Sequence, residues 1–135
     1  MKKFKIVALM LVFVLSLQCV AFANVQPRGV YLQGGGCSIA PSSGAVIVTG
    51  HTQAFERVDK ITVKVVVMKE VAMGVWTEVW SQTMSDYDEN YVCISNTTVN
   101  VDKGYRYMVE ATHTVKHGSL TETNYSETNP VIVSY

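Results

Sequence analysis

The histidines are the first residues of this sequence whose chemistry suggests a site, as metal ligands or as bases. His113 and His117 lie four positions apart, a spacing that would direct both imidazoles to one zinc ion on a helix. On a strand the same spacing separates them by about 13 Å, whereas two ligands of one zinc lie within ~4 Å of each other. We therefore expect no metal here, with His113 as a hydrogen-bonded residue near the edge of an inner face and His117 as a turn residue.

The acidic segment from Asp86 to Asn90 offers the chemistry of a calcium site. Its carboxylates stand at alternate positions, as they do in a calcium-binding loop. Tyr91, however, stands where such a loop has its sharp-turn glycine, and Thr97 stands where it has its closing glutamate. A solvated hairpin loop explains the same residues, and a weak calcium site stays open as the alternative.

Two tryptophans have the spacing of an aromatic platform for sugar rings. Trp76 and Trp80 are four positions apart with Glu78 between them, which would place both on one face of a strand, about 13 Å apart. The competing interpretation puts both indoles in the core together with Met84. We favour the core, because large aromatic side chains bury most of their area in a domain of this size.

Cys37 and Cys93 are the cysteines that remain when Cys19 is removed with an export signal. Two cysteines in an oxidising compartment are expected to form a disulfide. By closing a long loop, the bond would stabilise the fold by about 4 kcal/mol. Two reduced thiols, one or both of them buried, are the alternative.

The sequence gives no support to an enzyme or a nucleic-acid-binding protein. It contains no nucleophile elbow, phosphate-binding loop or dinucleotide fingerprint, so we expect neither catalysis nor a cofactor. Export would remove three of the eleven cations and none of the eleven anions, which leaves a net charge of −3. The remaining cations are scattered singly, whereas a phosphate-binding surface needs them clustered.

The N-terminus has the layout of a secretory signal. Three lysines among the first five residues precede a long apolar run, and Ala21 and Ala23 occupy the positions that a signal peptidase reads. We expect cleavage after Ala23, so that residues 1–23 are a signal peptide and residues 24–135 form one secreted domain without membrane association. An uncleaved anchor over residues 4–23 is the alternative, because this stretch is nearly long enough to span a bilayer.

The secondary structure that would position these candidate residues consists of β-strands. Apolar and polar residues alternate through most of residues 24–135, which is typical of strands with one buried face. In the fifth of the expected strands, Cys93 falls in the set that we expect to point inward. Seven short strands with turns about every ten residues are typical of a β-sandwich. The seven expected strands cover residues 30–39, 45–52, 61–68, 75–84, 91–101, 105–116 and 130–135.

The last third of the sequence resembles the closing strands of a fibronectin type III or immunoglobulin-like domain. The similarity lies in the tyrosine-containing run over residues 103–111, and then in Gly118, Ser126 and residues 130–133. It implies an all-β, immunoglobulin-like sandwich. It also implies that Tyr105 is the corner tyrosine, whose hydroxyl bonds to the backbone just before its strand.

Residues 24–135 also resemble a group of small exported proteins of Gram-positive bacteria that has no assigned activity. The match lies in the Pro-Arg-Gly-Val-Tyr-Leu motif at residues 27–32, in the hairpin around Trp76, and in residues 104–107. This resemblance implies export and the same fold, and it transfers no catalytic residue.

We expect the function to be non-catalytic binding of an extracellular protein or polysaccharide by a monomer. A small exported toxin or bacteriocin-like effector is the alternative from another class, although the charge of −3 counts against it. An enzyme is the third hypothesis.

The binding site is expected at one end of the sandwich, where the loops over residues 53–60 and 116–123 should meet. Phe55, Arg57 and His117 are the candidate ligand-binding residues, because aromatic side chains and arginine are enriched at interface centres. The alternative for Phe55 is that it folds inward and caps the core.

Overall fold

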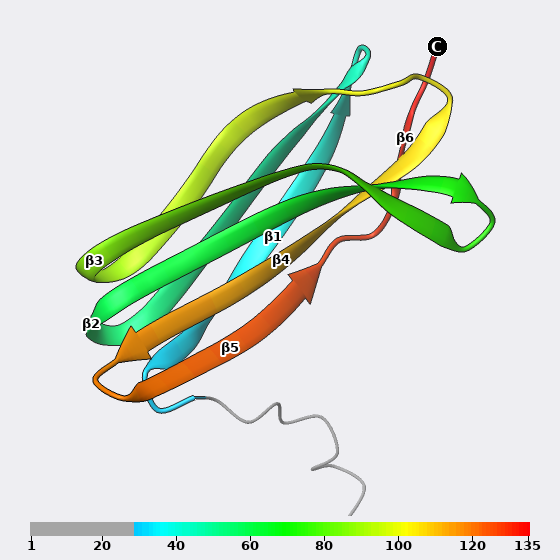
Figure 1. Ribbon diagram of the computed structural model, residues 1–135. Coiled ribbons are helices and arrows are strands. Elements are labelled where there is room, and N and C mark those ends of the chain that lie inside the picture. The colour runs from blue at the N-terminus through cyan, green and yellow to red at the C-terminus, as the bar shows by residue number, and fades with distance from the viewer. Residues whose placement is uncertain (1–28) are drawn as a thin grey trace, which may run out of the picture.

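The computed structural model describes residues 29–135, which form six strands (Figure 1). The expected all-β class is confirmed. The signal peptide and its cleavage after Ala23 lie outside the described residues. Across residues 29–135 no helix has the length and apolar character needed to cross a membrane. The strands are β1 (Leu32–Ser42), β2 (Ala45–Ala72), β3 (Val75–Asn100), β4 (Tyr105–His117), β5 (Leu120–Glu127) and β6 (Val131–Val133).

The structure has six strands where seven were expected. Two expected turns are continuous strand, which removes two strands from the count, and β5 adds one. β2 contains the segments 45–52 and 61–68, and β3 contains the segments 75–84 and 91–101. The expected last strand shrinks to β6, while β5 occupies residues that the sequence did not assign to a strand. β5 was missed because its residues are polar on both faces and alternate only between exposed and half-buried.

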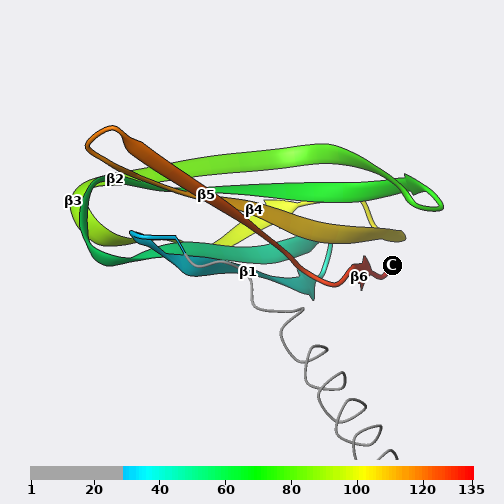
Figure 2. The same cartoon turned by 90° about the horizontal axis from the view of Figure 1, so that it is seen from below.

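The strands pair antiparallel in one sheet that folds over on itself into two layers (Figure 2). In the first layer, the first part of β2 pairs with β1 and with the second part of β3. In the second layer, the second part of β2 pairs with the first part of β3 and with β4. β5 and β6 complete the second layer by pairing with the two ends of β4.

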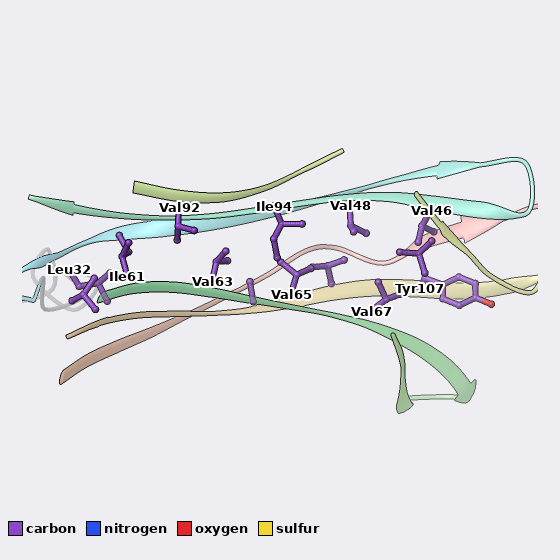
Figure 3. Packing of buried hydrophobic residues seen from close by; sticks show 14 of the residues in the cluster. Leu32, Val46, Val48, Ile61, Val63, Val65, Val67, Val92, Ile94 and Tyr107 are labelled. Atoms are coloured by element: carbon purple, nitrogen blue, oxygen red, sulfur yellow. The ribbon is translucent and has the colours of Figure 1, made fainter. Parts of the chain in front are cut away.

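The core lies between the two layers and consists mainly of valines. Val46, Val48, Val92 and Ile94 of the first layer face a row of buried side chains on β2 in the second layer, namely Ile61, Val63, Val65 and Val67 (Figure 3). These β-branched residues fit a pleated surface, and each buried side chain contributes about 1.5–3 kcal/mol. At Gly50 a Cβ would collide with Val65, so the glycine allows the layers to approach.

The expected disulfide between Cys37 and Cys93 is wrong, because both thiols are free. Cys37 pairs with Gly50 and packs against the core. Cys93 pairs with His51, the next residue along β2. Since successive residues of a strand point to opposite faces, the two thiols lie on opposite faces of the first layer.

A bulge in β3 explains why the sequence pattern misplaced Cys93. Val48 pairs with Thr97, whereas Gly50 pairs with Ile94, so β3 has one extra residue at this point. Asn96 stands in the bulge with φ 40°, a left-handed conformation that asparagine tolerates. An extra residue in a strand exchanges its inward-facing and outward-facing positions. Before the bulge the even-numbered residues Val92 and Ile94 therefore face the core, and Cys93 does not.

The tyrosine whose hydroxyl bonds to the backbone just before β4 is Tyr107, and the expected assignment of this role to Tyr105 is wrong. Tyr107 is fully buried, and its hydroxyl donates to the carbonyl oxygen of Asp102 at 2.7 Å. Tyr105 is 42% exposed. Both tyrosines point to the same face of β4, because they are two positions apart. Tyr105, however, lies beyond the end of the core.

Candidate functional site

His113 is buried and hydrogen-bonded through both ring nitrogens, as expected. The Thr52 hydroxyl donates to the carbonyl oxygen of Thr62 at 2.9 Å, so its oxygen accepts from Nδ1–H of His113 at 3.0 Å. Nε2 then accepts from the Ser126 hydroxyl at 2.7 Å. Burial, followed by the nearby charge of His51, lowers the pKa of His113 to about 4. The ring is therefore neutral at pH 7.

Ser126 and Cys37 extend this polar chain to the side where β1 and β5 meet. Ser126 Oγ lies 3.4 Å from Cys37 Sγ, and the thiol donates to the carbonyl oxygen of Val109 at 3.9 Å. Burial raises the pKa of Cys37, which disfavours the nucleophilic thiolate. His113 is only 1% exposed, which leaves its ring no space beside a substrate. We interpret the chain as structural, because it joins both layers.

The two segments expected to form the binding end do meet. Asp59 Oδ2 accepts from the backbone N–H of Gly118 at 2.6 Å, and Asp59 Oδ1 lies 3.7 Å from Nδ1 of His117. The ring centroids of His117 and Tyr31 are 4.6 Å apart. Residues 53–60 are not a loop, however. They are the part of β2 that crosses from one layer to the other.

The candidate ligand-binding residues have separate partners at this end. Phe55 is 48% exposed, so it does not cap the core; the buried residues around it are Ala54 and Val58. Arg57 Nη1 lies 3.8 Å from Asp88 Oδ2, whereas His117 lies beside Asp59. The structure therefore places these residues near one another in the fold but does not join them in a common cavity among the described residues.

Residues 29–32, the described part of the Pro-Arg-Gly-Val-Tyr-Leu motif, have a structural role at the same end. The carboxylate of Glu122 on β5 accepts from the backbone N–H groups of Val30, Tyr31 and Leu32 at 2.6, 2.9 and 2.7 Å. Burial raises the pKa of Glu122, but these three bonds outweigh it and the net shift is downward. A Cβ at Gly29 would collide with the same carboxylate. Residues 29–32 are therefore tied to β5 through Glu122.

The two tryptophans do not form a platform. Trp80 pairs with Val67 and packs against the core, whereas Trp76 pairs with Glu70. Val67 and Glu70 are three positions apart and point to opposite faces. Val79 is an extra residue in β3, and it exchanges the inward-facing and outward-facing positions between Trp76 and Trp80. The expectation that Trp76 also joins the core is wrong, as is the expectation for Met84, which is exposed at the edge of the second layer.

The acidic segment from Asp86 to Asn90 is part of strand β3, not a hairpin loop. Its side chains therefore spread along a strand, interrupted at Asp88, which has φ 53°. Within residues 29–135 no group of three or more His, Cys, Asp or Glu side chains is arranged to hold a metal ion.

The outward surface of the second layer carries polar rows that cross four strands. We call this surface, formed by residues 78–87 of β3, 60–68 of β2, 110–116 of β4 and 121–127 of β5, the outer face. Within it, Thr62 Oγ1 lies 2.8 Å from Ser85 Oγ. The rows follow the strand register and consist of Ser85, Thr62, Thr114 and Thr123; of Thr83, Lys64, Thr112 and Tyr125; and of Ser81, Val66, Glu110 and Glu127.

A groove of about 870 Å³ runs over part of this outer face. Half-buried Val66 and Met68 of β2 contribute its apolar residues. Its charged residues are Lys64 and the three glutamates Glu78, Glu110 and Glu127. Tyr125, from β5, lies at the groove and is 72% exposed. The groove therefore combines a small apolar area with acceptors, donors and one free aromatic ring.

A second tyrosine marks the far corner of the outer face. Tyr87 is exposed, and Nζ of Lys60 lies 5.6 Å from its ring centroid. Tyr87 lies on β3 and Tyr125 on β5, which are the two edge strands of this face. They are separated by three inter-strand spacings across the sheet and by four residues along the strands. With the usual strand spacings this separation is about 20 Å. The alternation of residues predicts polar, solvent-facing sides for β2 and β4, but it does not predict β5 and therefore does not predict this site.

Comparisons with known proteins give a family and no activity. The chain matches, over residues 21–131, the family described as "Family of unknown function (DUF6147)". No curated protein shows significant sequence similarity to the chain. Among solved structures it is similar to the "Solution Structure of R. palustris CsgH", with 19% identity, 71% of this chain and 92% of that chain covered, and a TM-score of 0.40.

Proposed function

This chain belongs to the DUF6147 family of unknown function, and we propose that it is a secreted, non-catalytic module that binds an extracellular polysaccharide. The proposed binding surface is the outer face. The observation that carries the proposal is the groove of about 870 Å³, in which Tyr125 stands beside carboxylates and hydroxyl rows.

The chemistry of the groove matches that of sugars. Carboxylates accept hydrogen bonds from sugar hydroxyls, and serine and threonine hydroxyls both donate and accept. The ring of Tyr125 and the apolar surface of Val66 and Met68 suit the C–H faces of a pyranose. The outer face is also long enough for several sugar units, given the ~20 Å between Tyr87 and Tyr125.

The same composition favours a polysaccharide over a protein partner. Centres of protein interfaces are enriched in tryptophan, tyrosine and arginine, and they are depleted of charged residues such as lysine and glutamate. The residues that line the groove include one tyrosine but neither tryptophan nor arginine, and four of them are charged. This is the composition of a hydrated, hydrogen-bonding surface.

The test is binding of the secreted chain to insoluble peptidoglycan, chitin, cellulose and xylan in a pull-down, followed by calorimetry with soluble fragments of the polymer that binds. Tyr125→Ala is expected to weaken binding about tenfold, equivalent to ~1.4 kcal/mol, with an unchanged melting temperature. Tyr135→Ala is the matched control, because Tyr135 is also exposed but lies outside the outer face.

Two results would contradict this function. One is the absence of binding to all four polymers. The other is binding that survives in the double variant Tyr125→Ala, Glu110→Gln while the fold is retained, since that would place the site elsewhere.

A further inference from the structure

The end of the β2–β3 hairpin is apolar and projects from the second layer. β2 pairs with β4 as far as Lys69, and the described residues beyond it pair with β3 and project from the rest of the second layer (Figure 1). Residues 71–76 read Val-Ala-Met-Gly-Val-Trp, without a charge. Met73, at the turn, is 99% exposed, and Val71 and Val75 beside it are exposed as well. A soluble domain rarely presents such a run without a partner.

The hairpin end is held in a fixed shape. Glu70 Oε1 accepts from the backbone N–H of Gly74 at 3.0 Å, and Oε2 of the same carboxylate accepts from Nη1 of Arg106 at 3.0 Å. The guanidinium carbon of Arg106 lies 5.9 Å from the ring centroid of Trp76. Gly74 has φ 72°, which suits glycine. Because the end is preorganised, little entropy is lost when it binds.

A groove of about 290 Å³ lies directly beside this hairpin end. Glu70, Val71 and Met73 line one side of it, and Tyr105 and Arg106 at the start of β4 line the other. The groove is large enough for one unbranched thioether side chain, which adapts well to irregular spaces. Further exposed apolar side chains at this end of the molecule are those of Tyr105, Ile132 and Tyr135.

We propose that this hairpin end is the interface between two copies of the chain, in which Met73 of each copy enters the groove of the other. A two-fold interface requires a surface that is complementary to itself, and a protruding side chain next to a groove meets this requirement. The exposed side chains of Met73, Val71 and Val75 are the apolar surface that a second copy would cover.

The charges at this end favour a second copy over a lipid surface. Binding to anionic lipid needs unneutralised lysine and arginine next to the apolar tip. Here Lys69 Nζ lies 2.8 Å from Asp102 Oδ2, and Arg106 is paired with Glu70. The proposed interface would make the chain a dimer, whereas the sequence led us to expect a monomer. It does not depend on the outer face.

The test is sedimentation equilibrium of the secreted chain over a range of concentrations, in which the wild type is expected to dimerise. Met73→Glu is expected to weaken the dimer at least about 100-fold, because it would bury an unpaired carboxylate. Since Met73 makes no buried contact, the monomeric Met73→Glu variant should have the same melting temperature as the monomeric wild type. Leu120→Glu is the control, because Leu120 is exposed at the start of β5, beside the opposite end of β4.

A wild type that is monomeric at about 100 μM, or a dimer that Met73→Glu leaves intact, would overturn the proposal. A monomer that cosediments with vesicles of phosphatidylcholine and phosphatidylglycerol, and loses this property on Met73→Glu, would also overturn it and assign the hairpin end to a lipid surface.

Discussion

Tyr107 fixes the start of β4 with a single hydrogen bond. Its hydroxyl reaches back to the carbonyl oxygen of Asp102, while the ring fills the end of the core. Tyr105, two positions earlier, instead packs under Nζ of Lys69, 3.7 Å from its ring centroid. One hydroxyl is therefore structural and the other is not.

Tyr107→Phe is expected to lower the free energy of unfolding by roughly 1–3 kcal/mol, because it leaves a carbonyl without its partner. Tyr105→Phe is the matched control and should change it by less than about 0.5 kcal/mol. Urea denaturation of both variants measures the difference. A larger effect at Tyr105 than at Tyr107 would show that the corner assignment is wrong.

His113 makes the stability of the fold depend on pH. Its pKa is about 4 in the fold against 6.5 when unperturbed, so between these values the unfolded chain binds a proton that the folded chain does not. Stability is therefore complete above about pH 6.5 and falls as the pH drops to 4. The loss attributable to this residue approaches ~3 kcal/mol.

Denaturation with urea at several pH values between 7 and 4 measures this slope. His113→Gln is expected to flatten it in that window, whatever its effect on the absolute stability. His117→Gln, which changes a half-exposed ring, should leave the slope in place. A slope that persists in His113→Gln would assign it to another group.

At the scale of the element, β3 is a long edge strand that, among the strands of residues 29–135, pairs only with β2. Such an edge invites pairing with other chains unless it is protected. The bulges at Val79 and Asn96 interrupt it. Asp86 adds a charge on the inward face, since it pairs with the buried Ile61. These are two recognised ways of protecting an edge.

Asp86→Val is expected to make the protein aggregate, because it replaces the inward charge of the edge with a β-branched apolar side chain. Thr83→Val is the matched control, since Thr83 lies on the outward face of the same strand. Light scattering during incubation at 37 °C follows the process. Equal aggregation of the two variants would mean that the added valine, and not the lost charge, is responsible.

At the scale of the whole molecule, the two layers hold together without a disulfide. The valine core and the polar chain through His113 join them instead. Cys37 lies between the layers and Cys93 on the opposite face of the first layer. The two thiols should therefore differ in reactivity.

Alkylation of the native protein is expected to label Cys93 faster than Cys37, because burial raises the pKa of Cys37 and limits access to it. Intact mass after unfolding should show two labelled thiols. The same spectrum tests secretion, since the exported chain is expected to begin at Asn24. A mass two hydrogens below that of the reduced chain would contradict the free thiols.

The sequence by itself determined the all-β class and the buried faces of the regular strands. Alternation has a period of two, and it holds wherever a strand has one apolar and one polar side. The residues from Ile61 to Val67 and from Tyr107 to Val115 were therefore placed correctly. It also indicated that His113 is an inner, hydrogen-bonded residue.

Only the tertiary structure decided the rest. One extra residue at Val79 and another at Asn96 reverse the alternation, so the faces of Trp76 and Cys93 could not be read from the pattern. Strand β5 has no apolar face of its own, and its pairing with β4 is what brings Tyr125 next to Thr112. The candidate groove depends on that pairing, because its residues come from four strands that only the register of the folded sheet places side by side.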